Sequence, residues 1–392
     1  MNRIYLCLAH MSGNEQKFIQ EAFDTNWVVP LGPNVNGFEQ DLSDFLNSKD
    51  NESNGIQHQV CALSSGTAAI HLGLILLDVK SGDEVICQSF TFAASANPVT
   101  YLGAQPVFVD SEPDTWNMDP KLLEEAIVDR ISKTGKKPKA IVAVHLYGMP
   151  CKMNEILEIS KKYDIPVLED AAEAIGSQYN GAYCGTLGKL GVLSFNGNKM
   201  ITTSGGGALI CKTVEEKQKI TFFATQAREA YPYYQHEQIG YNYRMSNICA
   251  GIGRGQMSVL DDHIKHHQWV LTRYKELLAD IPEIKVHLAP ADGMSLPNYW
   301  LTTVTIEGFS IRAVAGKKSL LKLIENMSER GVETRALWQP MHRQPGYRNA
   351  PSYINGVSDQ LFDCGLCLPS GPWVKEEELQ YISEALHHLI QD

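Results

Sequence analysis

Between residues 59 and 211 the chain alternates short apolar runs with longer segments whose apolar residues recur at helical spacing. This alternation is typical of a mainly parallel sheet with helices on both faces, because parallel strands need long crossover connections. Seven runs are expected to be strands: 60–63, 84–87, 106–109, 140–144, 167–169, 191–195 and 208–211. The helices expected between them are 67–77, 93–101, 121–131 and 153–163. The pattern predicts an α/β fold with one large domain built on a seven-stranded sheet.

The segments on either side of this region predict two domains. Apolar residues recur at helical spacing over 18–23 and 38–45, which indicates two amphipathic helices before the sheet. After about residue 256 the expected elements are a long polar helix, a strand and two further helices, over 261–278, 300–306, 317–330 and 376–390. We therefore expect a large domain over residues 1–255, which includes the amino-terminal helices, and a smaller α+β domain over 256–392.

Three histidines of the expected polar helix, His263, His266 and His267, share one helical face. They have metal-binding side chains, but no carboxylate-rich cluster accompanies them. Cys364 and Cys367 also have metal or redox spacing, without a second ligand pair. We expect a solvated histidine face, incidental packing of the two cysteines and no metal site.

Composition narrows the possible partners and location. A length of 392 residues with 44% apolar residues is enough for two domains with cores of their own. The formal net charge of −11 argues against general nucleic-acid binding, which needs a basic face. The longest apolar run, around 72–77, cannot span a bilayer, and the amino terminus is too weakly apolar for a signal peptide. With nine scattered cysteines, these features predict a soluble cytoplasmic protein with reduced thiols and no membrane attachment.

Lys199 lies between an expected strand and the turn Gly205-Gly206-Gly207, downstream of the acidic segment 168–173. A lysine amine holds an aldehyde cofactor as an imine only when it can lose its proton, and partial burial favours the neutral form. The cofactor ring withdraws electrons when a buried carboxylate keeps its nitrogen protonated, and Asp170 ends an apolar run where such a carboxylate is needed. The pair suggests pyridoxal phosphate chemistry. The alternatives are a solvated surface lysine and an aspartate that caps a helix.

The segment Ser-Ser-Gly-Thr (64–67) follows a strand and opens a helix. The free backbone N–H groups and the positive end of that helix would attract a phosphate, although the segment is also an ordinary helix cap. At the next strand-to-helix junction, Phe90 or Phe92 could stack on a planar ring; we favour Phe92, and filling of the core is the alternative for both. These features predict a cradle for a phosphorylated, planar cofactor.

Seven ordered motifs resemble the DegT/DnrJ/EryC1/StrS aminotransferases over nearly the whole chain. The motifs are Ser-Ser-Gly-Thr-Ala-Ala (64–69), Thr-Phe-Ala-Ala (91–94), His-Leu-Tyr-Gly (145–148), Glu-Asp-Ala-Ala-Glu-Ala (169–174), Ser-Phe-Asn-Gly-Asn-Lys (194–199), Gly-Tyr-Asn-Tyr-Arg-Met-Ser-Asn (240–247) and Glu-Thr-Arg-Ala-Leu-Trp (333–338). The resemblance implies a fold-type I, aspartate aminotransferase-like enzyme that uses pyridoxal phosphate to aminate nucleotide-linked keto sugars. Segments 194–207 and 367–371 look most similar to 4-aminotransferases acting on UDP-2-acetamido-4-keto-6-deoxy sugars, as in bacillosamine biosynthesis.

Carried over by position, the resemblance implies a role for individual residues. Lys199 forms the imine, Asp170 pairs with the ring nitrogen and Phe92 stacks on the ring. The phosphate is held by Gly66, Thr67 and Ser194 of one subunit and by Asn242 of the other, which implies a homodimer. Glu173 stands on the side of the cofactor hydroxyl, where many relatives carry His or Gln.

The implied reaction takes the amino group from glutamate and delivers it to the keto sugar, for surface-glycan biosynthesis. A sugar nucleotide presents a diphosphate and hydroxyl groups, so Arg228, Arg244, Trp338 and His342 are candidates for substrate contacts. Two alternatives remain. One is a dehydratase or lyase that uses the same cofactor, and the other is a cofactor-binding regulator without turnover.

Overall fold

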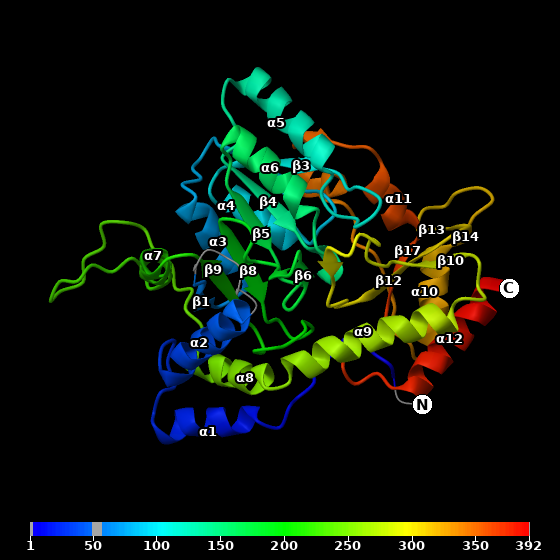
Figure 1. The fold of residues 1–392 in the computed structure, drawn as a ribbon, viewed down its shortest axis with the longest axis horizontal. Helices are drawn as coiled ribbons and strands as arrows, with labels where there is room; N and C mark the ends of the chain where they lie inside the picture. Colours follow the sequence, from blue (N-terminus) through cyan, green and yellow to red (C-terminus); the bar gives the residue numbers. More distant parts are fainter. Residues whose placement is uncertain (1–2, 49–56, 392) are drawn as a thin grey trace.

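The computed structural model describes residues 3–48 and 57–391. A large sheet lies at one end of the molecule and a smaller one at the other, and the long helix α9 (Leu260–Leu277) runs along both (Figure 1). The large sheet has eight strands in the order β1-β9-β8-β5-β4-β2-β3-β16. Their bounds are β1 Gln59–Leu63, β2 Glu84–Gln88, β3 Gln105–Val109, β4 Ala140–Val144, β5 Val167–Asp170, β8 Leu190–Ser194, β9 Gly207–Cys211 and β16 Ser352–Tyr353. All seven predicted strands are confirmed.

The direction of the strands decides where the functional segments meet. Strand β9 is antiparallel to both of its neighbours, β1 and β8, and every other pair in the large sheet is parallel. Strands β1, β2, β4, β5 and β8 therefore end at the same edge of the sheet. Ligands of open α/β sheets bind at this edge, and here it gathers the segments that follow Leu63, Gln88, Asp170 and Ser194.

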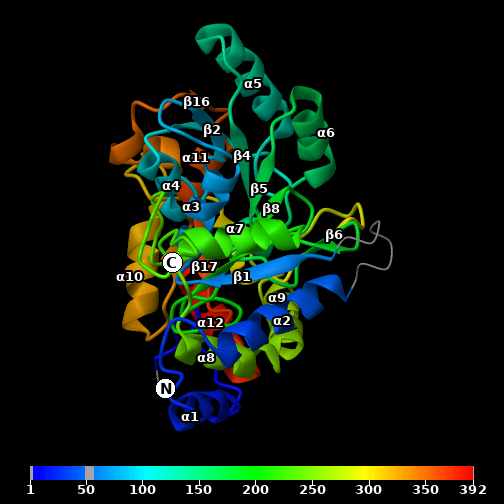
Figure 2. The ribbon, with the colours of Figure 1, turned by 90° about the vertical axis from the view of Figure 1, so that its left-hand side faces the viewer.

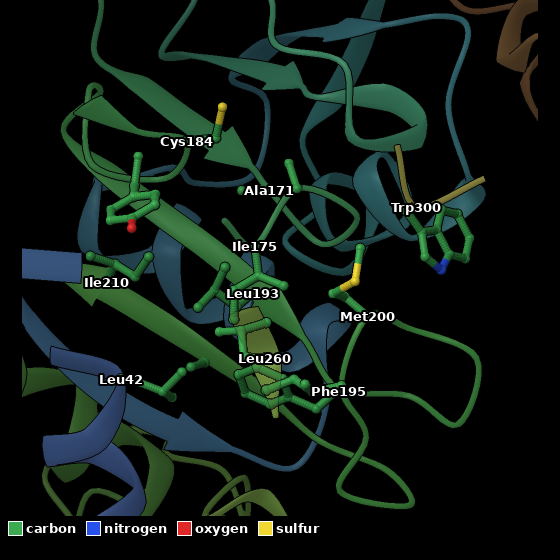
Figure 3. Close-up of a cluster of buried hydrophobic side chains, with 14 of the residues drawn as sticks. Leu42, Ala171, Ile175, Cys184, Leu193, Phe195, Met200, Ile210, Leu260 and Trp300 are labelled. Atoms are coloured by element: carbon green, nitrogen blue, oxygen red, sulfur yellow. The ribbon is translucent and has the colours of Figure 1, made fainter. Parts of the chain in front are cut away.

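Helices cover both faces of the large sheet, as the sequence predicts (Figure 2). Alternate residues of one strand point to opposite faces, so that Val142 packs with helix α3 and Ile141 packs on the other side. The helices around this sheet are α2 (Pro33–Asn47), α3 (Gly66–Leu76), α4 (Asn97–Tyr101), α5 (Pro120–Thr134), α6 (Met153–Tyr163) and α7 (Val214–Ala224), with a 3₁₀ turn at Ala93–Ser95. Figure 3 shows the core cluster in which Leu42 of α2, Leu193 of β8 and Ile210 of β9 lie.

Helix α8 (Asn247–Met257) packs against α1 (Glu15–Asp24) and α2 through glycines. A Cβ atom at Gly253 would lie 2.7 Å from the Phe38 ring, and one at Gly255 would lie 2.7 Å from Glu15 Cα. The glycine-rich run at 251–255 therefore serves close helix packing.

The smaller sheet is antiparallel, with the order β10-β12-β17-β15. Its strands are β10 Ile284–Val286, β12 Thr302–Ile306, β15 Arg335–Ala336 and β17 Gly365–Leu368, and its helices are α10 Leu320–Glu329, α11 Val357–Cys364 and α12 Glu376–Gln391. Short strands complete the fold: β6 Gln178–Tyr179, β7 Ala182–Tyr183, β11 Ser295–Leu296, β13 Phe309–Ser310 and β14 Lys318–Ser319, with 3₁₀ turns at Leu146–Gly148, Met341–Arg343 and Pro345–Tyr347.

Two segments connect the ends of the molecule across the predicted domain boundary. Ile4 packs in the core around the small sheet and pairs with Val332, whereas β16 from the carboxy-terminal part joins the large sheet beside β3. Residue 255 itself lies inside α8. The division into 1–255 and 256–392 stays a prediction.

The expected solvated histidine face on α9 is wrong for two of its three members. His263 and His267 are buried, and His263 Nδ1 lies 3.0 Å from the carbonyl oxygen of Met200. Burial lowers the pKa of His267 to about 3, so this side chain is neutral at pH 7. The apolar residues Val270, Leu271 and Tyr274 on the same helix are buried as well, which shows that α9 is a core helix with a polar sequence.

All nine cysteines are free thiols, and Cys367 is buried in β17. Within residues 3–48 and 57–391, no group of three or more His, Cys, Asp or Glu side chains could hold a metal ion. No helix in this described part of the chain combines the length and the apolar character needed to cross a membrane.

Candidate active site

A cavity of about 310 Å³ lies at the edge where the parallel strands end. Eight of the residues singled out from the sequence line it: Gly66, Thr67, Phe92, Asp170, Glu173, Ser194, Lys199 and Trp338. They come from five separate segments of the chain, and strand order alone brings four of these segments together. Most of the predicted cofactor residues therefore share one cavity.

Lys199 follows β8 in a tight turn, where its backbone N–H donates to the carbonyl oxygen of Asn196 at 2.9 Å. Its Nζ atom lies 3.2 Å from Oε1 of Glu173 and 4.0 Å from the centroid of the Trp300 ring. The lysine side chain is 12% exposed. The amine is thus sheltered between a carboxylate and an aromatic face, and the alternative of a solvated surface lysine does not fit this position.

Glu173 is buried, and burial raises the pKa of its carboxyl, while the nearby Lys199 cation and the Tyr147 N–H oppose that shift. Its Oε2 accepts a hydrogen bond from the Tyr147 N–H at 2.7 Å. Tyr147 has a φ of +55°, which an aromatic residue rarely adopts, and its hydroxyl accepts from the Trp338 N–H at 3.0 Å. One carboxylate therefore connects the lysine to a constrained turn.

Asp170 ends β5 and is almost completely buried. Its Oδ1 accepts from the Ala172 N–H at 3.1 Å, and its Oδ2 accepts from the Ser95 hydroxyl at 2.7 Å. The residues after Asp170 form turns, so the alternative of a helix cap does not apply. The carboxylate is held in place and lines the cavity, as a partner for a ring nitrogen requires.

The sequence predicts a phosphate cradle at the first turn of α3, which opens at the cavity. Ser65 caps the helix by accepting a hydrogen bond from the Ala68 N–H at 3.0 Å. A Cβ atom at Gly207 would lie 2.3 Å from the Gly66 nitrogen, and one at Gly66 would lie 3.1 Å from Ser194 Cβ. Because neither residue has a Cβ atom, the chain segments pack closely here and the backbone N–H groups at the helix end stay accessible to an anion.

The two phenylalanines after β2 have different environments. Phe90 is fully buried in the core, whereas Phe92 is 55% exposed and lines the cavity. Phe92 meets the Trp338 ring edge to face, with centroids 4.6 Å apart. Phe92 is therefore the phenylalanine that could cover a ring, and Phe90 fills the core. The cavity lined by Phe92, the predicted cradle, the Asp170 carboxylate and the sheltered Lys199 fits a phosphorylated aromatic aldehyde.

Three candidates lie outside this cavity, around a second hollow next to Pro30 and Leu31: Arg228, Asn242 and Arg244. Arg244 donates to Glu39 at 2.6 Å and to the Ala62 carbonyl oxygen at 3.0 Å, so its guanidinium already has partners. Arg228 stacks on Tyr234 in a long loop that projects beyond α7 (Figure 1). Their contact with substrate stays a prediction.

His342 is not among the residues that line the cavity. Its Nδ1 is 2.8 Å from the Ser89 hydroxyl, and its Nε2 is 3.5 Å from Asp359. The substrate role predicted for His342 is not tested by this arrangement.

The sequence did not single out Trp300 or Ser95, although both line the cavity. Trp300 is buried beside Met200 in the cluster of Figure 3, and its indole N–H donates to the Asn198 carbonyl oxygen at 2.7 Å. It follows the first helix of the small domain, so no local pattern places it near Lys199. Ser95 directly follows the motif that carries Phe92, and that proximity was the available signal.

Comparisons with known proteins agree with this geometry. A sequence model of the DegT/DnrJ/EryC1/StrS aminotransferase family matches residues 10–387. The chain is 46% identical to EpsN of Bacillus subtilis (strain 168), provisionally named a pyridoxal phosphate-dependent aminotransferase, over 99% of this chain and 96% of the relative. It is 34% identical to the GDP-perosamine synthase of Escherichia coli O157:H7, over 97% of both chains.

A crystal structure of a DegT DnrJ EryC1 StrS aminotransferase from Brucella abortus has a TM-score of 0.86 and 27% identity to this chain, with 97% of this chain and 96% of that one covered. The PLP form of Spr1654 from Streptococcus pneumoniae has a TM-score of 0.88 and covers 99% of both chains, at 24% identity. The second likeness concerns the fold alone.

Proposed function

Because this chain belongs to the DegT/DnrJ/EryC1/StrS aminotransferase family, we propose that it moves an amino group from glutamate to the keto carbon, C4, of a nucleotide-linked keto-deoxy sugar. The chain is a pyridoxal phosphate-dependent sugar aminotransferase of fold type I, so the activity, cofactor and fold predicted from the sequence are confirmed. The proposal concerns the substrate. We favour UDP-2-acetamido-2,6-dideoxy-4-keto-hexose, used for surface-glycan biosynthesis.

The observation that carries the proposed reaction is the sheltered position of Lys199, 3.2 Å from Glu173, in one cavity with Asp170 and the phosphate cradle. The preference for a UDP sugar rests on the resemblance of segments 194–207 and 367–371 to UDP-sugar 4-aminotransferases. A GDP-linked sugar is the competing choice, because a relative with 34% identity is named a GDP-perosamine synthase.

Pyridoxal phosphate, when bound, supplies an aldehyde that reacts with amines and a ring that accepts the electron pair released at the α-carbon. The backbone N–H groups of Gly66 and Thr67 would bind its phosphate, and Phe92 would cover one face of its ring. Asp170 would hold the proton on the ring nitrogen. The amine of Lys199 would hold the group in the cavity and would carry the proton of the substrate α-carbon, and Glu173 would keep this amine in reach.

We further propose that the working unit is a homodimer in which Asn242 reaches the phosphate of the other subunit. Asn242 is exposed and lines the hollow outside the cavity of its own chain. Seven exposed apolar side chains lie on the segments around this hollow and the projecting loop: Trp27, Val28, Val29, Leu31, Tyr233, Tyr234 and Ile239. Exposed apolar surface of this kind marks an interface. The cytoplasmic location expected from the sequence is part of the same proposal, and the nine free thiols support it.

The experiment offers the purified protein glutamate and, in separate reactions, UDP-, GDP- and dTDP-linked 4-keto sugars. We expect the fastest amination with the UDP-linked acetamido sugar, and one 2-oxoglutarate for each amino sugar formed. Equal rates with all three nucleotides would contradict the preference for UDP. Product without 2-oxoglutarate would indicate a dehydratase or lyase, and absence of turnover with every sugar would favour a regulator.

The role of the lysine is tested with Lys199→Ala, which should lose turnover and also lose the cofactor adduct that borohydride traps on the wild type. Lys189→Ala is the matched control, because Lys189 is a half-exposed lysine that pairs with Glu216 at the protein surface. It should keep both properties. Multiple turnover by Lys199→Ala would contradict the assignment of the lysine.

A further inference from the structure

Two buried hydroxyls connect the loop after β2 to the end of β5. Ser95 Oγ donates to Oδ2 of Asp170 at 2.7 Å, and Thr91 Oγ1 lies 2.7 Å from Ser95 Oγ. Ser95 is 1% exposed and Thr91 is 2% exposed. All three side chains line the cofactor cavity. No role was assigned to either hydroxyl by the sequence motifs.

The donors and acceptors in this series of three side chains have only one consistent arrangement. A serine hydroxyl has a single proton, and an ionised carboxylate can only accept. Because Ser95 gives its proton to Asp170, its oxygen must accept the proton of Thr91. The hydrogen bonds therefore run in one direction, from Thr91 through Ser95 to Asp170, and bonds in such a chain strengthen one another.

Asp170 is held from two sides. Its Oδ1 accepts from the backbone of Ala172, and its Oδ2 accepts from Ser95. The hydroxyl and the backbone amide together fix the plane of the carboxylate, because rotation about its last bond would break both. Each oxygen has a second lone pair, so the carboxylate can still accept from a group in the cavity.

The other titratable groups that face Asp170 cannot replace this contact. They are Cys87 on β2, Cys151 and Glu173, and burial raises the pKa of each. The two thiols are therefore neutral and only weak donors, and Glu173 is already engaged with Lys199 and Tyr147. Ser95 is the strong side-chain donor that the described residues give to this carboxylate.

We propose that Ser95, supported by Thr91, is a positioning residue that sets the direction in which Asp170 meets the ring nitrogen of the cofactor. The same short loop carries Phe92, so it controls both the ring face and the carboxylate. This inference rests on the pyridoxal phosphate part of the proposed function and does not depend on the sugar.

The test compares Ser95→Ala with the wild type in the holoenzyme. A misdirected carboxylate holds the ring proton less well, so we expect the pH midpoint of the bound cofactor's absorbance to shift. We expect cofactor affinity to fall about tenfold, as for loss of one hydrogen bond to a charged group. In the amination assay kcat should fall while the KM for glutamate changes little. A Ser95→Ala enzyme with the wild-type absorbance titration and affinity would overturn the inference.

Thr91→Val and Thr91→Ser test the second link without touching Ser95. The valine variant loses the donor and should show a smaller shift of the same sign, and the serine variant should restore the wild-type titration. Ser370→Ala is the matched control, because Ser370 is a fully buried serine that donates to the Leu368 carbonyl oxygen in the small domain. It should leave the absorbance titration unchanged. If Ser370→Ala shifts the titration as much as Ser95→Ala, the effect is general loosening and the inference fails.

A double-mutant cycle separates Ser95 from a direct contact with the cofactor. In an Asp170→Asn background, Ser95→Ala should cause no further change of the titration, because the hydroxyl acts through the carboxylate. Full additivity would contradict the proposal. The absorbance measurements need no sugar, so inactivity toward every keto sugar would defeat the proposed substrate and leave this inference standing.

Discussion

The Nζ atom of Lys199 lies 3.2 Å from Oε1 of Glu173, and the other oxygen of the same carboxylate holds the backbone N–H of Tyr147 at 2.7 Å. The Tyr147 hydroxyl in turn accepts from the Trp338 N–H, which belongs to the carboxy-terminal part of the chain. Glu173 thus links the amine of Lys199 to two other segments of the site. Its side chain has a positioning function besides any contact with the cofactor.

This double role predicts different outcomes for two substitutions of Glu173. Glu173→Ala leaves the buried Tyr147 N–H without an acceptor, which should cost about 1–3 kcal/mol of unfolding free energy in the cofactor-free protein. Glu173→Gln keeps an acceptor oxygen and should lose less. Denaturant unfolding of the two variants measures the difference. Equal losses would show that the Tyr147 contact contributes nothing to stability.

Phe92 should contribute to cofactor binding through its ring. Stacking of aromatic rings is worth about 0.5–1.5 kcal/mol beyond burial, so Phe92→Ala should weaken the affinity for pyridoxal phosphate by up to about tenfold. Phe92→Tyr keeps the ring and should bind as the wild type does. Fluorescence titration of the cofactor-free protein measures both affinities. An unchanged affinity in Phe92→Ala would assign the ring contact to another residue.

The sequence predicts the large domain well because its parallel strands are buried apolar runs separated by amphipathic helices. All seven expected strands form, and helix α6 has the predicted bounds Met153–Tyr163. The eighth strand, β16, was not predicted, because two residues give no periodicity and it is formed only through pairing with β3. The buried histidines of α9 were misinterpreted because a polar sequence does not reveal which face a neighbouring domain covers.

Most residues predicted to bind the cofactor line one cavity because they lie in local motifs at strand ends, and parallel strands bring their ends together. Trp300 and Glu173 show the limit of this reasoning. The aromatic face over Lys199 comes from a residue 101 positions further along the chain, and only the packing of the small domain places it there. Similarly, the bond from Glu173 to the Tyr147 backbone depends on the positive φ of Tyr147, which an aromatic residue type does not indicate.

His267 should make the protein sensitive to acid. Burial lowers its pKa from 6.5 to about 3, so below pH 6.5 the unfolded chain binds a proton that the folded chain does not. Stability is therefore complete above pH 6.5 and is lost as the pH falls from 6.5 toward 3. At pH 5 the loss from this group alone is about 2 kcal/mol.

His267→Gln and His267→Phe remove this proton site, so each should lose less stability than the wild type between pH 7.5 and pH 5. The comparison is made within each protein, which cancels any packing defect of the variant. His387→Gln, at a half-exposed histidine near Asp280, is the control and should follow the wild type. Parallel pH profiles for all four proteins would show that His267 is protonated equally in the folded and unfolded states.

The proposed sharing of Asn242 between subunits can be tested by complementation. Lys199→Ala and Asn242→Ala should each have low activity as homodimers, the first because it lacks the amine and the second because its phosphate site is weakened. In a mixed dimer, one site combines the intact Lys199 of one subunit with the intact Asn242 of the other. That site should work, whereas the second site of the mixed dimer carries both substitutions and should not.

Activity should therefore rise when the two low-activity proteins are unfolded together and refolded as a mixture. Random pairing makes half of the dimers mixed, and each of these has one intact site out of two, so about a quarter of the wild-type activity is expected. If Asn242 served the cavity of its own chain, each site in a mixed dimer would keep one defect and no activity would return. The arrangement within one chain favours sharing, because Asn242 lines a different hollow from that of Lys199. Activity of the mixture no higher than the mean of the two homodimers would refute the shared site.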